Sequence, residues 1–414
     1  MWARRAQTAL LVFLACHGCM AEDVEPSAFY SDTLYEQGYA ESLAPVTLSD
    51  DGTLVTWWHR DFLDAGTSEY DVITWDAFTG DQLLLTKVAL ITPTPTGVLY
   101  AGPPALSAIG SDGFIIHAGD HFLAATDPVG NPWWQVVLGG FVSTSVNIAA
   151  DESIIVGDYE GVLYCFEANG DPRWAVALPG IAFNHAAIQP DGQSWFAVKY
   201  PDASWGLVAV DADGTLAVEV ATGTVTGSPS IGADGRVLVA EFTGTPDDPD
   251  PPPESFVLRA YETDGSLAWE APIDGQGASA ITAPSGTVFV AAQRSTAGES
   301  GHLIALAGNN GAELWRTELE GDIFQPALLD NGVIVVGCGQ ALCGYDSGNG
   351  VELFAYPGSS EGGGTLGPPL ARDGQIIATT GYAYLSWMAG GHVNTEPNSW
   401  ARLGGNDRMT GQAP

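Results

Sequence analysis

Few residues of this 414-residue chain stand in patterns that commonly do chemistry. His117 and His121 in "HAGDH" have the spacing of two metal ligands on one helix face, but the residues around them predict a β-hairpin. "GSSEG" at 358–362 matches the pattern of a hydrolase nucleophile elbow, yet no helix is predicted after it. The sequence therefore predicts no catalytic residue, no metal site and no bound cofactor.

Three of the five cysteines lie beyond the first twenty residues. Cys165 in "VLYCFE" is expected to be a buried, unreactive thiol. Cys338 and Cys343 flank "GQAL". If Gln340 and Ala341 form a two-residue turn, these two cysteines lie directly opposite each other, close enough for a disulfide bond. We predict that bond.

The charge balance excludes two classes of partner. Lys and Arg total 13 against 50 Asp and Glu, which gives a formal net charge of -37. Such a surface repels the phosphate backbone of nucleic acids and does not dock on anionic lipid through basic patches. The acidity favours solubility, and capture of cations is the alternative interpretation.

The first residues predict export. "MWARRAQTALLVFLACHGC" has two arginines, then an apolar stretch, then small residues and cysteines, which is typical of a secretory signal over residues 1–21. "FLAC" is similar to a bacterial lipobox and makes Cys16 the candidate lipid anchor, while "CHGC" makes Cys19 a second one. Cleavage after Ala21 would instead release an unanchored protein. The predicted location is the bacterial outer membrane or cell surface as a lipoprotein, otherwise the periplasm or the medium.

A short unit recurs along the chain with a period of about 40 to 50 residues. Its first turn reads "DDG", "SDG", "PDG", "ADG", "PSG", "DNG" or "RDG", and a degenerate copy, "ADES", lacks the glycine. Seven of these eight turns end in a glycine: Gly52, Gly113, Gly192, Gly235, Gly286, Gly332 and Gly374. Such turns between β-branched runs favour tight hairpins of type I′.

Eight repeats of four short strands each predict an all-β chain, an eight-bladed β-propeller of four-stranded antiparallel blades. The propeller is expected to cover residues 45–411. Residues 22–44 form an N-terminal segment that could contribute a closing strand. Two alternatives stay open for the strand that completes the last blade: residues 28–43 or residues 399–403.

An aromatic residue follows a glycine by four positions near the end of several repeats. On the outer strand of a blade, such a ring can pack across the gap to the next blade, and a buried Trp covers about 150–250 Å². This structural role is predicted for Trp134, Trp174, Trp269, Trp315 and Phe354.

These units resemble the repeats of pyrroloquinoline-quinone-type propellers, whose blades end in Ala-x-Asp-x-x-x-Gly-x-x-x-Trp. "IALAGNNGAELW" fits except at Ala307, "GYDSGNGVELF" keeps Asp346 and Gly350, and "SWARLGGNDRMTG" at 399–411 is similar to a C-terminal signature of such proteins. The quinone-dependent dehydrogenases of this family carry adjacent cysteines, which this chain lacks. The resemblance therefore implies a non-enzymatic branch, similar to the propeller lipoproteins that scaffold outer-membrane assembly, with a quinone-dependent dehydrogenase as the alternative.

A binding surface is predicted on one face of the ring. The tight turns fall on the opposite face, whereas longer insertions are predicted at 59–70, 200–206, 243–255 and 293–301. Linker residues near the central opening of the first face complete the predicted partner face: His185, Ser228, Ser279 and Gln325. We expect a monomer that binds proteins of the cell envelope through this face.

Overall fold

The computed structural model describes most of the chain between residues 107 and 357 and separate strands on either side of it. Within 107–357, residues 120, 128–130, 246–251, 294–299, 322–324 and 340 fall outside the description. On either side, the described residues are 27–29, 41–42, 47–48, 53–62, 67–76, 82–91, 369–372, 375–379 and 384–388. The first twenty-one residues, with Cys16 and Cys19, lie outside the described residues.

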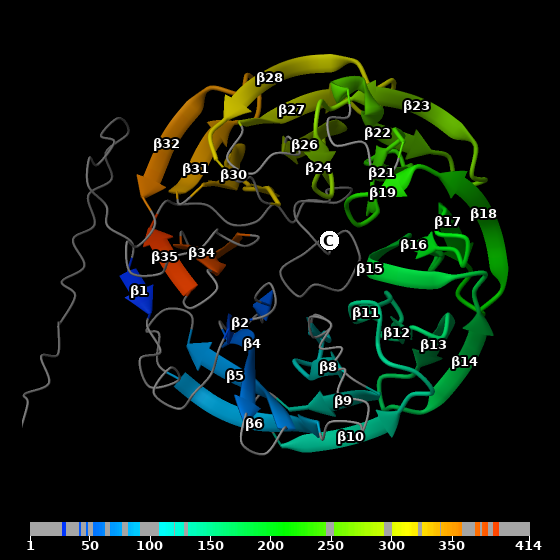
Figure 1. The fold of residues 1–414 in the computed structure, drawn as a ribbon. Helices are drawn as coiled ribbons and strands as arrows, with labels where there is room; N and C mark the ends of the chain where they lie inside the picture. The colour runs from blue at the N-terminus through cyan, green and yellow to red at the C-terminus, as the bar shows by residue number, and fades with distance from the viewer. Residues whose placement is uncertain are drawn as a thin grey trace, which may run out of the picture.

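The described strands pair antiparallel into sheets of four or five strands that stand around a ring (Figure 1). The first sheet holds β2 (Glu41–Ser42), β3 (Thr47–Leu48), β4 (Thr53–Phe62), β5 (Thr67–Asp76) and β6 (Gln82–Ile91). The second holds β7 (Ala108–Ile109), β8 (Ile115–Gly119), β9 (Phe122–Thr126) and β10 (Pro132–Val137). The third holds β11 (Asn147–Ile148), β12 (Ile154–Gly157), β13 (Val162–Phe166) and β14 (Pro172–Ala177). The fourth holds β15 (Ile181–Ile188), β16 (Ser194–Lys199), β17 (Trp205–Val210) and β18 (Leu216–Thr222).

The later sheets repeat this arrangement. The fifth holds β19 (Thr224–Val225), β20 (Ser230–Ile231), β21 (Val237–Phe242), β22 (Phe256–Tyr261) and β23 (Leu267–Pro272). The sixth holds β24 (Gln276–Gly277), β25 (Ile281–Thr282), β26 (Thr287–Gln293), β27 (Gly301–Ala307) and β28 (Glu313–Leu319). The seventh holds β29 (Ala327–Leu328), β30 (Val333–Cys338), β31 (Ala341–Asp346) and β32 (Glu352–Pro357). The last sheet holds β33 (Leu370–Arg372), β34 (Gln375–Thr379), β35 (Tyr384–Met388) and β1 (Ser27–Phe29).

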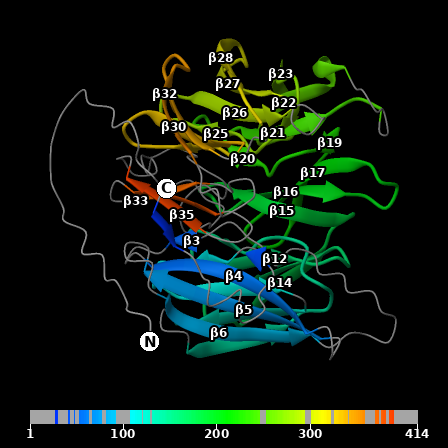
Figure 2. The same ribbon diagram turned by 60° about the vertical axis from the view of Figure 1, so that its left-hand side comes forward.

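The N-terminal strand lies in the last sheet. β1 pairs antiparallel with β35, Ser27 opposite Ser386 and Phe29 opposite Tyr384. Of the two alternatives for the closing strand, the described residues therefore favour the N-terminal segment, and residues 399–403 lie outside them. Strands from near the two ends of the sequence pair in one sheet, and this pairing closes the ring (Figures 1 and 2).

Helix is almost absent from the described residues. A single 3-10 turn, η1 (Pro253–Ser255), precedes β22. None of the helical segments in the described part of the chain has the length and apolar character needed to cross a membrane.

The tight turns differ from the type I′ geometry expected from the sequence. In the fifth sheet, the Gly235 N–H donates to the Gly232 oxygen at 2.9 Å, and the Gly232 N–H donates to the Arg236 oxygen at 2.8 Å. Gly235 has φ +85°, whereas Asp234 does not have a positive φ. The loop thus has three residues, with glycine alone in the left-handed region. Glu152, which replaces the glycine in the degenerate copy, takes the same conformation at φ +64°.

Two of the four predicted insertions are not extended loops. Residues 59–62 and 67–70 continue strands β4 and β5, with His59 paired to Tyr70, and residues 63–66 lie outside the described residues. Residues 200–206 contain a tight turn, because Lys199 already pairs with Trp205. The extra residues lengthen the strand pairs, since continued pairing satisfies backbone groups that a loop would leave to solvent. The insertions at 243–255 and 293–301 fall partly outside the described residues.

The outer-strand tryptophans reach into the next sheet. The Trp134 indole N–H donates to the Ala168 oxygen at 2.9 Å, and the ring covers Gly170, where an added Cβ would lie 2.7 Å from it. The same two contacts recur for Trp174 on Ala212 and Gly214, Trp269 on Gly308 and Gly311, and Trp315 on Ser347 and Gly350. The glycine of each motif therefore receives the ring of the preceding repeat.

Two repeats depart from this contact. Val218 stands four residues after Gly214, where other repeats have tryptophan, and it approaches Gly265 of the fifth sheet. Phe354 lies over Gly344 of the paired strand and stacks with Tyr356 at 4.6 Å. Gly344 thus gives Phe354 a place within its own sheet.

Cys338 and Cys343 form a disulfide in the described β30–β31 hairpin, with Cα atoms 6.2 Å apart. The predicted register is wrong, because Cys338 pairs with Ala341 and Val336 pairs with Cys343. Gly339, at φ +60°, lies in the turn and shifts it by one residue from the expected position. The two cysteines are diagonal neighbours on one side of the hairpin.

The contact between Gly170 and the Trp134 ring gives a direct test of the packing between sheets. Gly170→Ala should lower the free energy of unfolding by about 1–2 kcal/mol for the positive φ and by about 1–3 kcal/mol more for the clash with the indole. Gly286→Ala is the matched control, because Gly286 has φ +84° and an added Cβ there meets nothing within 4 Å. Urea unfolding measures both, and equal losses would contradict the packing role.

The disulfide is tested by thiol titration. Protein purified from an oxidising compartment and then denatured should gain two titratable thiols on reduction, and the Cys338→Ser variant should not show this gain. Cys165 should react only after denaturation, because burial raises the pKa of this thiol to about 11. An unchanged thiol count in the wild type would refute the bond.

Candidate functional site

The four linker residues predicted for the partner face occupy one position of the repeat. His185, Ser228, Ser279 and Gln325 each lie seven residues before a turn glycine. At this position the innermost strand is interrupted; in β15, for example, pairing with β16 breaks between Phe183 and Ala187. The freed backbone groups can therefore bond across to the neighbouring sheet.

Hydrogen bonds join these residues from sheet to sheet around the centre of the ring. The His185 N–H donates to Ser228 Oγ at 3.3 Å, and the Ser228 N–H donates to Ser279 Oγ at 2.7 Å. The Ser279 N–H donates to Gln325 Oε1 at 2.9 Å, and Gln325 Nε2 returns a bond to the Ser279 oxygen at 2.6 Å. We call this chain of four residues the inner ladder. His185 lies in β15, which faces the middle of the ring (Figure 1), and the other three residues lie between strands.

The inner ladder offers little surface to a partner. The exposed fractions of its residues are 1% for His185, 7% for Ser228, 4% for Ser279 and 8% for Gln325. Their observed contacts hold consecutive sheets at a set spacing. Direct contact between these side chains and a partner stays a prediction, and the burial favours a supporting role.

The linkers between sheets and the loops between second and third strands lie on the same face, which we call the linker face. The Tyr159 N–H donates to the Phe141 oxygen at 2.8 Å, and the Leu178 N–H donates to the Gly161 oxygen at 2.8 Å. In each pair, one residue lies in the loop between β12 and β13 and the other lies in a linker between sheets. These bonds tie the loop of the third sheet to the linkers on either side of it.

A buried carboxylate anchors the linker face in the fifth sheet, and sequence reasoning missed it. Glu241 is fully buried and accepts hydrogen bonds from the Gly223 N–H at 2.8 Å, Arg259 Nη1 at 2.9 Å and the Tyr261 hydroxyl at 2.6 Å. Burial, followed by the charge of Glu241, raises the pKa of Tyr261, which keeps this hydroxyl a donor. Glu241 is thus committed to holding the linker that enters its sheet.

Asp158 is a second buried carboxylate, which holds the loop of the third sheet on the linker face. It is 1% exposed and accepts from the Glu160 N–H at 3.0 Å, the Val162 N–H at 2.9 Å and the Tyr164 hydroxyl at 2.8 Å. Asp158 lies six residues after Glu152, and Glu241 lies six residues after Gly235, the equivalent turn positions of their repeats. That shared position was the available signal, and the strong acidity of the whole chain obscured it.

Five aromatic rings run along the linker face across the second, third and fourth sheets. His121 and Phe141 lie 3.9 Å apart between ring centroids, Tyr159 and Phe183 lie 5.8 Å apart, and Phe183 and Trp205 lie 5.7 Å apart. The backbone bond from Tyr159 to Phe141 links the two groups. We call these five residues the aromatic strip. The repeat pattern did not predict it, because the rings come from linkers, loops and strand ends of different repeats.

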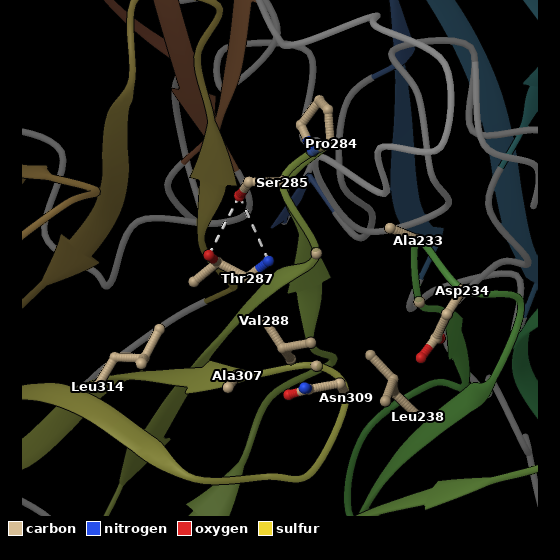
Figure 3. Close-up of a pocket in the computed structure, with 13 residues that line it drawn as sticks. Ala233, Asp234, Leu238, Pro284, Ser285, Thr287, Val288, Ala307, Asn309 and Leu314 are labelled. Atoms are coloured by element: carbon tan, nitrogen blue, oxygen red, sulfur yellow. Dashed lines mark hydrogen bonds between the residues drawn. The ribbon is translucent and has the colours of Figure 1, made fainter.

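A cavity of about 440 Å³ opens on the opposite face, between the turn ends of the fifth and sixth sheets (Figure 3). Asp234 and Leu238 line it from one sheet, and Ser285, Thr287 and Asn309 line it from the other. A smaller groove of about 120 Å³ occupies the same repeat position between the third and fourth sheets. The cavity is thus a feature of the repeat, and we assign no chemistry to it.

His117 is also accounted for by the fold. It is fully buried and lies 2.8 Å from Thr126 Oγ1 through Nε2, and burial lowers its pKa to about 3. His121 belongs to the aromatic strip instead. Within the part of the chain that the structure describes, no group of three or more His, Cys, Asp and Glu side chains could hold a metal ion.

Residues 254–393, about a third of the chain, match the family described as "Outer membrane protein assembly factor BamB". The chain carries PQQ-like propeller repeats. The matched region runs from just before β22 of the fifth sheet to beyond β35 of the last, and it includes Trp269, Trp315 and Gln325. No curated protein shows significant sequence similarity to the chain.

Solved structures share the fold at low sequence identity. The Dos1 propeller is 8% identical with a TM-score of 0.60, over 88% of this chain and 95% of that chain. The C-terminal WD40 domain of Sif2 is 14% identical with a TM-score of 0.56, over 87% and 97%. Quinohemoprotein alcohol dehydrogenase from Comamonas testosteroni is 13% identical with a TM-score of 0.56, over 84% and 72%. At such identities these likenesses show the propeller fold alone.

The inner ladder can be tested by removing one hydroxyl. Ser279→Ala leaves the buried Ser228 N–H without its acceptor, which should cost about 1–3 kcal/mol of unfolding free energy. Ser266→Ala is the control, because this exposed serine bonds only within its own turn, to Asp264 at 2.6 Å, and should stay within about 0.5 kcal/mol of wild type. Chemical denaturation compares the two, and similar values would show that the ladder does not hold the sheets.

Proposed function

We propose that this chain is an exported eight-bladed propeller of the cell envelope that acts by binding other proteins through its linker face. The match of residues 254–393 to a family described as an outer membrane assembly factor carries this proposal. The eight sheets among the described strands support the blade number. Rigid rings with loops on one face commonly serve recognition.

The proposed organisation is a signal over residues 1–21, a segment over 22–44 and a propeller over 45–411. The pairing of β1 with β35 adds part of the segment to the ring. Cys16 and Cys19 both remain candidates for the lipid anchor. An anchor of this kind would hold the ring at the membrane surface as a monomer, without a spanning helix.

A quinone-dependent dehydrogenase is the alternative. The fold of the quinohemoprotein alcohol dehydrogenase favours it only at the level of architecture. The adjacent cysteine pair that the resemblance associates with quinone catalysis does not occur in this sequence. Oxidation of alcohols or sugars by the purified protein with pyrroloquinoline quinone, Ca²⁺ and a redox dye would favour this alternative over protein binding.

Replacing the insertion in the fifth sheet tests the binding function. The Thr243 N–H donates to the Ser255 oxygen at 2.8 Å, so the ends of this insertion are already in hairpin register. Substituting Asn-Gly for residues 244–254 should leave the ring folded and reduce capture of envelope proteins by about tenfold, as measured by affinity purification and quantitative mass spectrometry.

A variant on the opposite face provides the control for this capture. Asp213→Ala and Asp264→Ala together remove two exposed turn carboxylates and should capture the same proteins as wild type. Equal capture by the loop variant and the wild type would exclude this insertion from the binding surface. Capture of no envelope protein by the wild type would refute the proposed function itself.

A further inference from the structure

The aromatic strip is accessible at its centre. Phe141 and Tyr159 are each 43% exposed, which is high for large rings that already touch their neighbours. Phe183, Trp205 and His121 are partly exposed. Clustered exposed aromatic surface of this kind is typical of a site of interaction.

The angles between the rings favour side chains over sugars as the bound group. The interplanar angles are 42° for His121 and Phe141, 77° for Tyr159 and Phe183, and 46° for Phe183 and Trp205. Successive sugar rings stack on aromatic faces that share a plane. Tilted rings present faces and edges in turn, which gives separate side chains distinct places to pack over them.

The charges around the strip favour a cationic partner. Glu160 is exposed, and its side chain lies against Gly140, next to Phe141. Asp202 is exposed in the turn between Lys199 and Trp205. Among the described residues, neither of these two carboxylates is in an ion pair, whereas Arg173, Arg236, Arg259 and Arg316 are each paired with acids.

One ring of the strip already holds a cation. Lys199 Nζ lies 5.9 Å from the centroid of the Trp205 ring. The exposed faces of Phe141 and Tyr159 offer the same attraction to an incoming ammonium or guanidinium group, worth about 0.5–1 kcal/mol at exposed sites. With 13 basic residues against 50 acidic ones, the chain also attracts cationic partners at long range.

We propose that the aromatic strip binds a polypeptide segment in which arginine or lysine alternates with apolar residues. The apolar side chains pack over the exposed faces and edges of the tilted rings. The cationic groups lie over Phe141 and Tyr159, beside Glu160. This inference rests on the proposed protein-binding function and names the kind of partner that the linker face takes.

The direct test uses labelled twelve-residue peptides and the full-length protein at 150 mM salt. An alternating Arg-Leu peptide should bind with one-to-one stoichiometry by fluorescence anisotropy. The Glu-Leu peptide of the same length should bind at least tenfold more weakly. Tyr159→Ser and Phe141→Ser should each weaken binding of the Arg-Leu peptide by about tenfold, and Glu160→Gln by about threefold.

Leu267→Ser is the matched control variant, because Leu267 is 50% exposed on β23, outside the strip. It should bind the Arg-Leu peptide as wild type does, which separates the strip from general attraction to an acidic surface. If Tyr159→Ser does not fold, Tyr159→Leu keeps the apolar contact, removes the ring face and should still weaken binding.

Three results would overturn the inference: ring variants that bind like the wild type, equal binding of the Glu-Leu peptide, or one-to-one binding of maltohexaose that the Phe141 and Tyr159 variants abolish. If the wild type captures envelope proteins but ignores the Arg-Leu peptide, the partner chemistry is wrong and the binding function stands. If the wild type captures no envelope protein, the proposed binding function itself is wrong, and this inference has no basis.

Discussion

The packing of an indole ring on the glycine of the next repeat is the contact on which the ring depends. A four-stranded sheet of this size cannot bury both of its faces alone, so each sheet needs its neighbours. The tryptophan supplies the area that crosses the gap, and the glycine supplies the room for it. Because Gly170 lies at φ +85° beneath Trp134 and also begins the motif that ends in Trp174, one residue serves two sheets. A change at such a glycine therefore acts on both.

The inner and outer contacts between sheets stabilise the ring in different ways. On the outside, indoles and glycines give large apolar contact. Near the centre, Ser228, Ser279 and Gln325 set the spacing through directional hydrogen bonds, which apolar packing cannot do. Buried carboxylates such as Glu241 hold the linkers. Buried hydrogen-bonded groups thus lie beneath the linker face. They fix the backbone that carries its exposed rings.

The architecture could be predicted from the sequence because the same structural features recur in repeat after repeat. Turn glycines, β-branched strands and the Gly-x-x-x-Trp spacing each recur, so that single ambiguous motifs support one another. The errors lie where a single residue decides the outcome. Type I′ turns were expected from Asp-Gly pairs, but Asp234 keeps an ordinary backbone and leaves the positive φ to Gly235 alone. In the cysteine hairpin, Gly339 moved the turn by one residue.

The aromatic strip could not be predicted for a different reason: its residues have no common sequence position. Phe141 comes from a linker, Tyr159 from a loop and Trp205 from a strand, and only the packing of consecutive sheets brings them together. Charge and rings also contribute at different stages of binding. The acidic field reaches about 8 Å at physiological salt and raises the rate of encounter without selecting an orientation. Tilted rings act only at contact, so they decide which cationic segments remain bound, and specificity on this face resides in the rings.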